Sequence, residues 1–127
     1  MKNVLLVDDD EIFNFLNTKV LQGMGFAGEI HSALNGKQAI DLLNEYYSGI
    51  SAAPDIILLD LDMPVLDGFG FIEAFRRLNM PNKENTHIII VTSSNNPNDV
   101  AKAKELGITR YLTKPLTKED LRAVLEG

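Results

Sequence analysis

The chain has 127 residues, of which 45% are hydrophobic and 24% charged, the proportions of a globular domain large enough for one core. Twelve basic and 18 acidic residues give a net charge of −6, which argues against direct binding to nucleic acid. Because cysteine is absent, disulfides, thiolate metal sites and cysteine nucleophiles are excluded.

No apolar run approaches the roughly 20 residues that a membrane-spanning helix needs. The first residues run directly into a strand-like segment and lack the features of a secretory signal peptide. We therefore expect a soluble, cytoplasmic protein with one domain over residues 1–127. The alternative for the end of the chain is that Glu126 and Gly127 are a cloning remnant and that the natural protein continues.

Strand-like and helix-like segments alternate along the whole chain. The first half predicts strands over residues 4–7 and 30–33, a helix over 11–23 with Ile12, Leu16 and Val20 on its apolar face, and a helix capped by Asn35. The second half predicts strands over 56–59, 87–91 and 111–112, a helix from residue 68, a helix over 96–106 and a last helix capped by Thr117. Five strands alternating with five helices predict an α/β fold with a parallel sheet covered on both faces.

Polar side chains follow the predicted strands at their carboxyl ends. Asp8 and Asp9 follow the first strand, Asp60 the third, Thr92 the fourth and Lys114 the fifth. In a sheet of order 2-1-3-4-5 the first and third strands are neighbours, and ligands bind at the crevice between them. Clustered carboxylates raise a pKa or recruit a cation, and an all-oxygen set suits Mg²⁺. A metal, a lysine, a hydroxyl donor and a carboxylate nucleophile together are what phosphoryl transfer needs.

Five short motifs at these strand ends resemble those of the receiver domain of two-component response regulators, of the chemotaxis type that consists of a single domain. They are Val7-Asp8-Asp9, Leu59-Asp60 with Met63-Pro64, Asp67-Gly68, Val91-Thr92-Ser93, and Tyr111-Leu112-Thr113-Lys114-Pro115. The resemblance covers essentially the whole chain. It implies a flavodoxin-like, doubly wound fold with a five-stranded parallel sheet of order 2-1-3-4-5.

The resemblance also implies a role for individual residues. Asp60 would be the phosphoacceptor, Asp9 a direct Mg²⁺ ligand, Asp8 the holder of a metal-bound water, and Asp62 the donor of a backbone carbonyl to the metal. Thr92 and Lys114 would contact the phosphate, Tyr111 would be the switch aromatic, and the Lys114–Pro115 bond would be cis. Asp62 and Ser94 stand two residues beyond Asp60 and Thr92, where the family tunes the lifetime of the aspartyl phosphate.

The resemblance implies a histidine kinase or a histidine phosphotransfer protein as the phosphoryl donor. The protein would be a switch and no enzyme beyond accepting its own phosphoryl group and slowly losing it. We expect a downstream protein to bind the face formed by residues 96–106, Tyr111 and the last helix. A phosphorelay shuttle that passes the group to another histidine is the alternative within this class.

A phosphatase of the haloacid-dehalogenase type is the alternative from another class, because Asp60-Leu61-Asp62 resembles its Asp-x-Asp motif. That motif normally lies on the first strand and continues with Thr or Val where Met63 and Pro64 stand. Its domain is also usually larger than 127 residues. A receiver-like scaffold that is never phosphorylated is a third alternative, although every residue that the chemistry needs is present.

Overall fold

The computed structural model describes residues 2–25, 27–47, 53–79, 83–93, 96–108 and 110–126. Its strands are β1 (Lys2–Val7), β2 (Ala27–Ala33), β3 (Ile56–Leu59), β4 (His87–Thr92) and β5 (Tyr111–Thr113). Its helices are α1 (Glu11–Met24), α2 (Gly36–Tyr47), α3 (Gly68–Arg77), α4 (Pro97–Glu105) and α5 (Lys118–Glu126), with a short 3-10 helix, η1 (Lys83–Asn85), before β4. Strands and helices therefore alternate as predicted, within a few residues at their ends.

Within these described ranges the five strands form one parallel sheet in the order β2-β1-β3-β4-β5. The register sets Val7 of β1 beside Leu59 of β3, so the residues that follow them leave the sheet side by side. All four residues of β3 are buried, as expected of a strand covered on both faces. The predicted flavodoxin-like, doubly wound fold is confirmed.

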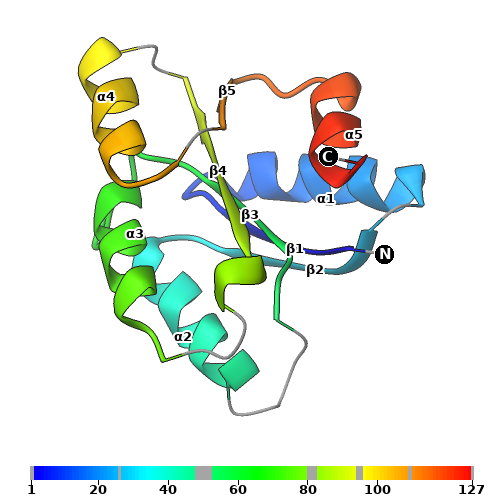
Figure 1. Cartoon of the computed structure of the whole chain (residues 1–127). Helices are drawn as coiled ribbons and strands as arrows, with labels where there is room; N and C mark the ends of the chain where they lie inside the picture. The colour runs from blue at the N-terminus through cyan, green and yellow to red at the C-terminus, as the bar shows by residue number, and fades with distance from the viewer. Residues whose placement is uncertain are drawn as a thin grey trace.

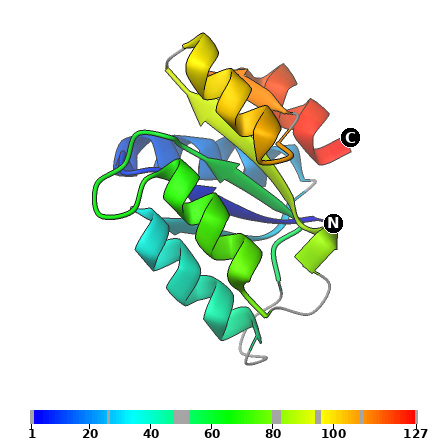
Figure 2. The same cartoon turned by 60° about the vertical axis from the view of Figure 1, so that its left-hand side comes forward.

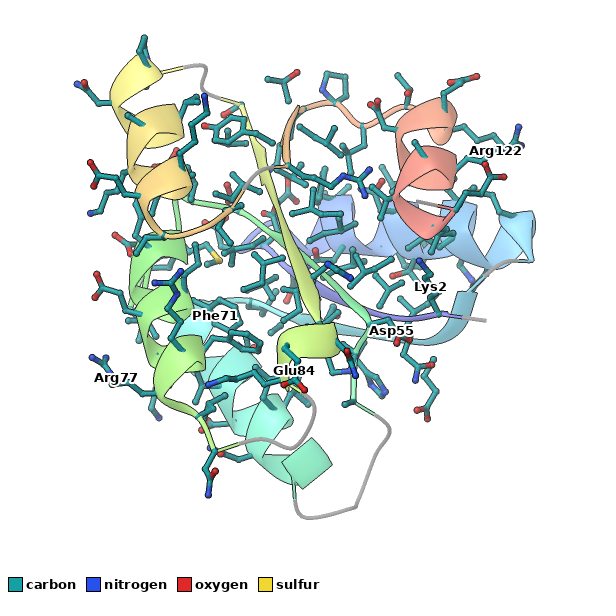
Figure 3. The ribbon with its side chains drawn as sticks, in the orientation of Figure 1. Lys2, Asp55, Phe71, Arg77, Glu84 and Arg122 are labelled. Atoms are coloured by element: carbon teal, nitrogen blue, oxygen red, sulfur yellow. The ribbon has the colours of Figure 1, made fainter. Side chains whose placement is uncertain are left out.

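The helices divide between the two faces of the sheet, as Figures 1 and 2 show: α2, α3 and α4 lie on one side, α1 and α5 on the other. Each face has its own apolar cluster. The α2–α4 side is filled around Phe71, Ile72 and Leu43, and the α1–α5 side around Leu6, Leu58 and Leu121. Figure 3 shows Phe71 pointing inward from α3 while Arg77, on the same helix, points away from the protein.

Side-chain caps start the helices close to the strand ends. The Asp10 carboxylate accepts hydrogen bonds from the N–H groups of Ile12 and Phe13, and the Asp67 carboxylate accepts one from Gly70. Asn35 caps α2, as predicted, and Asn96 caps α4. None of the helices within the described ranges is both long and apolar enough to cross a membrane.

The prediction for the inward face of α1 was wrong. Ile12 and Leu16 are 70% and 55% exposed, and of the predicted stripe only Val20 packs against the core. A stripe with a spacing of four residues drifts by about 40° around the helix at each step, so its first members turn away from the sheet. The inward face instead carries Leu21 and two buried asparagines, Asn14 and Asn17.

Candidate functional site

Three carboxylates meet at the carboxyl ends of β1 and β3. Asp8 and Asp9 follow β1, and Asp60 follows β3. Each contributes one carboxylate oxygen to a group in which all the oxygens lie within 4.8 Å of one another. Asp8 and Asp60 are only 2% and 6% exposed, whereas Asp9 is exposed, so the cluster has a buried floor and an open side. The sequence-based expectation that these acids gather at one sheet edge is met by this geometry.

Lys114 brings a positive charge into the same pocket from the end of β5. Its Nζ atom lies 2.6 Å from Oδ2 of Asp8 and 3.8 Å from Oδ2 of Asp60. Its backbone N–H donates to the carbonyl of Thr92 at 2.9 Å, which extends the β4–β5 pairing by one bond. The ammonium also lies 4.4 Å from the ring centre of Phe13 in α1, and the peptide bond to Pro115 is cis.

The charges of the pocket explain its protonation behaviour. Burial raises the pKa of Asp60 to about 6; the nearby charge of Asp8 also raises this pKa and that of Lys114 lowers it. Burial likewise raises the pKa of Asp8, with Lys114 acting in the opposite direction. Three ionised carboxylates and one ammonium leave two negative charges uncompensated. A hard divalent cation with oxygen ligands, such as Mg²⁺, fits this donor set in charge and chemistry.

Two further residues named from the sequence lie on the β4–β5 side. Thr92 is completely buried at the end of β4, which lies between β3, followed by Asp60, and β5, followed by Lys114. Tyr111 begins β5 and is half-buried against the apolar cluster of the α2–α4 side. Burial raises the pKa of its hydroxyl, and the charges of Asp99 and Asp62 raise it further.

The loop after β3 forms the rim of the pocket. Asp62 is exposed, and its backbone N–H faces Oδ1 of Asp60 at 3.4 Å. Val65 is 78% exposed and has a φ of 70°, in the left-handed region that a β-branched residue rarely adopts. Ser94, the second residue expected to tune the phosphate lifetime, lies outside the described residues.

One residue of the site was missed by the sequence reasoning. The side-chain amide of Asn14, on the inward face of α1, donates a hydrogen bond to the backbone carbonyl of Asp8 at 2.9 Å. The signal that could have identified it is a polar residue at a helix position that faces the sheet. That signal was hidden because the apolar stripe of α1 was assigned to the wrong face.

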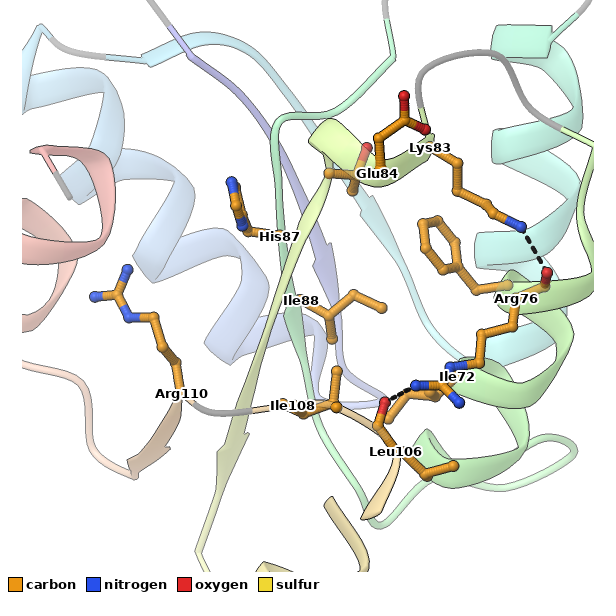
Figure 4. A pocket seen from close by; sticks show the side chains of 12 residues that line it. Ile72, Arg76, Lys83, Glu84, His87, Ile88, Leu106, Ile108 and Arg110 are labelled. Carbon is orange, nitrogen blue, oxygen red and sulfur yellow. Dashed lines mark hydrogen bonds between the residues drawn. The ribbon is translucent and has the colours of Figure 1, made fainter. Parts of the chain in front are cut away.

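A cavity of about 340 Å³ lies at the opposite end of the sheet, between the end of α3, η1, the start of β4 and the α4–β5 connection (Figure 4). Two of the cations that line it, Arg76 and Lys83, are engaged with the backbone. Arg76 donates to the carbonyl of Leu106, and Nζ of Lys83 donates to the carbonyls of Arg76 and Leu78 at 2.5 and 2.9 Å. These contacts satisfy carbonyls at the ends of α3 and α4, and the cavity contains none of the clustered acids.

The sequence matches the family model of the response regulator receiver domain over residues 4–126. It is 32% identical over 124 residues to a probable chemotaxis protein CheY of Rhizobium etli, covering 98% of this chain and 89% of that protein. The crystal structure of a two-component response regulator from Cytophaga hutchinsonii superposes with a TM-score of 0.85 at 37% identity, covering 98% of this chain and 93% of that one.

The Mn²⁺-bound form of response regulator Rcp1 is also similar, with a TM-score of 0.79 at 29% identity and coverage of 99% and 91% of the two chains. The family match spans nearly the whole chain, and no finding favours the phosphatase alternative. The chain belongs to the family of response regulator receiver domains and is a phosphorylation-dependent switch of two-component signalling.

Proposed function

We propose that Asp60 is the residue of this switch that accepts the phosphoryl group. The observation that carries the proposal is its position: a buried carboxylate at the end of β3, within 4.8 Å of the acids of β1 and 3.8 Å from the ammonium of Lys114. In the reaction, a carboxylate oxygen of Asp60 attacks the phosphorus of a phosphohistidine. The P–O bond forms as the P–N bond breaks, and the electron pair leaves with the imidazole.

Asp8, Asp9 and Asp60 are the side chains that would hold Mg²⁺, together with the backbone carbonyl of Asp62. When bound, the ion supplies positive charge that stabilises the oxygens of the transferring phosphoryl group. The Mn²⁺-bound form of the similar protein Rcp1 supports binding of a divalent cation. Lys114 contributes a second, permanent positive charge beside the metal, and Thr92 contributes a hydroxyl that can donate to a phosphoryl oxygen.

The donor is a histidine kinase or a histidine phosphotransfer protein, and it has to reach the open side of the pocket. Three exposed apolar side chains lie on α1, soon after Asp8 and Asp9 in sequence: Ile12, Phe15 and Leu16 are 70%, 60% and 55% exposed. An exposed apolar surface of this kind marks a protein-binding site. We therefore assign the donor contact to α1, beside the loop that carries Asp8 and Asp9.

The output contact is assigned to α4, Tyr111 and α5. The phosphoryl group adds a charge of about −1.5 to −2, which attracts Lys114 and the hydroxyl of Thr92. Thr92 is followed by the connection to α4 and pairs with β5, so a shift of its side chain reaches both α4 and Tyr111. Asp62 and Ser94 would set how fast water removes the group. Transfer onward to another histidine remains the alternative fate of the phosphoryl group.

Intact-mass spectrometry after incubation with acetyl phosphate tests the proposal. The wild type should gain the mass of one phosphoryl group with Mg²⁺ and none with EDTA, and Asp60→Asn should gain none. Asp62→Asn is the matched control, because it removes an exposed acid two residues away and should retain the adduct. An adduct on Asp60→Asn would contradict the assignment. Release of phosphate without any adduct on the wild type would support the phosphatase alternative.

A further inference from the structure

Asn14 is a buried amide whose presence the packing of α1 does not explain. It is 4% exposed, and its Oδ1 atom has no hydrogen-bond partner among the described residues. A buried polar atom without a partner destabilises the folded state, and an apolar side chain of the same size would avoid this cost. An asparagine at this position is therefore explained only if its amide nitrogen, Nδ2, has a role.

The other end of the amide holds the carbonyl of Asp8. The N–H of Asp8 donates to Ala33 at 3.1 Å, which is the last residue of β2, so the pairing of β1 with β2 ends at this point. The carbonyl of Asp8 receives its hydrogen bond from Nδ2 of Asn14 at 2.9 Å instead. The side chain of Asn14 thus supplies the hydrogen-bond donor for this carbonyl at the point where the β1–β2 pairing ends.

This bond fixes the peptide plane between Asp8 and Asp9. Asp9 is exposed, and within the described part of the chain no side chain or backbone group binds its carboxylate. The direction of that carboxylate therefore depends on its backbone. The three acids repel one another, and a peptide plane that is held at its carbonyl resists the rotation that would move Asp9 away from Asp8 and Asp60.

We infer that Asn14 is a positioning residue: its amide holds the Asp8–Asp9 peptide so that the three carboxylates stay assembled for a divalent cation. The inference rests on the proposed function, since it concerns the same acidic pocket. Removing a group that hydrogen-bonds to a metal ligand, without touching the metal itself, typically lowers metal affinity by about 10–100-fold. The effect on this protein should appear in the dissociation constant for Mg²⁺ rather than in the stability of the fold.

Calorimetric titration with Mg²⁺ tests the inference on Asn14→Leu and on a matched control, Asn17→Leu. Asn17 is also a buried asparagine of α1, but its amide donates to the carbonyl of Phe13 within the helix, at 2.8 Å. Asn14→Leu should raise the dissociation constant by about tenfold or more, and Asn17→Leu should leave it unchanged. Excess Mg²⁺ should restore labelling of Asn14→Leu by acetyl phosphate, because the defect is one of affinity.

Urea unfolding of each variant separates positioning from stability, and Asn14→Ala removes the same donor if leucine prevents folding. A dissociation constant for Asn14→Leu or Asn14→Ala that matches the control would overturn the inference while leaving Asp60 as the acceptor. The same holds if both asparagine positions weaken binding equally and in proportion to lost stability. A wild type that binds no Mg²⁺ would overturn the proposed metal site itself, and this inference with it.

Discussion

The two sides of the acidic pocket are built differently. On the side of β1 and β3, residues 4–7 and 56–59 are all buried between the two helix layers. Asp8 and Asp60 directly follow these buried segments. On the side of β5 and α4, β5 has only three residues, none of them fully buried. Ala103 is the one residue of α4 that is fully buried. The side of β1 and β3 holds the carboxylates in place, whereas β5 and α4 have few buried contacts with the core.

Apart from Ala103, α4 is linked to α3 by polar contacts at the surface. The ammonium of Lys102 lies 4.5 Å from the ring centre of Phe69 in α3, and Arg76 of α3 donates to the carbonyl of Leu106. Such contacts can be exchanged for water without opening a cavity in the core. Assembling like charges therefore requires a rigid support, whereas transmitting a response requires an element with more than one accessible position.

The largest expected effect comes from shortening one leucine on each side. Leu58 of β3 and Leu112 of β5 contact the same apolar cluster on the α1–α5 side, but Leu58 is 3% exposed and Leu112 is half-buried. Leu58→Ala should lower the free energy of unfolding by about 2–5 kcal/mol. Leu112→Ala should lower it by roughly 1 kcal/mol, because less apolar surface is lost from the core.

Urea unfolding followed by circular dichroism measures both losses. The two substitutions remove the same atoms, so the difference between them reports the support on each side. Equal losses would show that β5 is anchored as firmly as β3, and the contrast between the two sides would fail.

The second largest effect is expected from removing the negative charge of Asp60, on the side of β1 and β3. The pKa of Asp60 is raised from 3.8 to about 6 in the folded protein, so the folded state binds this proton more tightly than the unfolded chain does. The stability that comes from protonated Asp60 is fully present below about pH 4 and is lost as the pH rises through about 6. At pH 7, Asp60→Asn should be more stable than the wild type by about 1–3 kcal/mol.

Unfolding in EDTA at several pH values checks this, because no cation then offsets the repulsion. The advantage of Asp60→Asn should shrink as the pH falls from about 6 towards about 4. Asp62→Asn, which alters an exposed acid, should change the stability by no more than about 0.5 kcal/mol. A constant advantage of Asp60→Asn at all pH values would mean that ionisation of Asp60 is not its cause.

The rigid side was also the side that the sequence predicted best. A strand buried on both faces needs an uninterrupted apolar run, and the first polar residue after it marks the sheet edge. Residues 56–59 and Asp60 follow this rule, and β3 has the predicted bounds. The helix predicted from residue 68 is also present as α3, and its large apolar residues Phe71, Ile72 and Phe75 are buried.

The inward face of α1 could not be predicted in this way. Asn14 and Asn17 are buried because backbone carbonyls accept their amide hydrogens, and one of those carbonyls lies in a loop that precedes the helix. A periodicity argument places polar residues outside and cannot see a partner supplied by the tertiary structure. The same reasoning places apolar residues inside, yet Ile12, Phe15 and Leu16 are exposed on the opposite face of α1.

The smallest effect expected here is at the rim of the rigid side. Val65 follows β3 by six residues, has a φ of 70° and has a side chain that is 78% exposed. A β-branched residue in this region carries strain of about 1–3 kcal/mol, and glycine would remove it. Glycine also gains entropy in the unfolded chain, so Val65→Gly should stabilise the protein by a net amount of only about 0.5–1 kcal/mol.

Val65→Ala is the control, because it keeps a Cβ atom at the same φ and should stabilise less than Val65→Gly in urea unfolding. The rate of labelling by acetyl phosphate gives the second half of the test. If Val65→Gly is more stable and labels as fast as the wild type, the strain is local and the rigid side tolerates it. If the added stability is accompanied by slower labelling, the strained turn itself shapes the mouth of the pocket, and rigidity on this side comes from the loop as well as from the buried strands. Val65→Gly that is less stable than Val65→Ala would show that the turn is not strained.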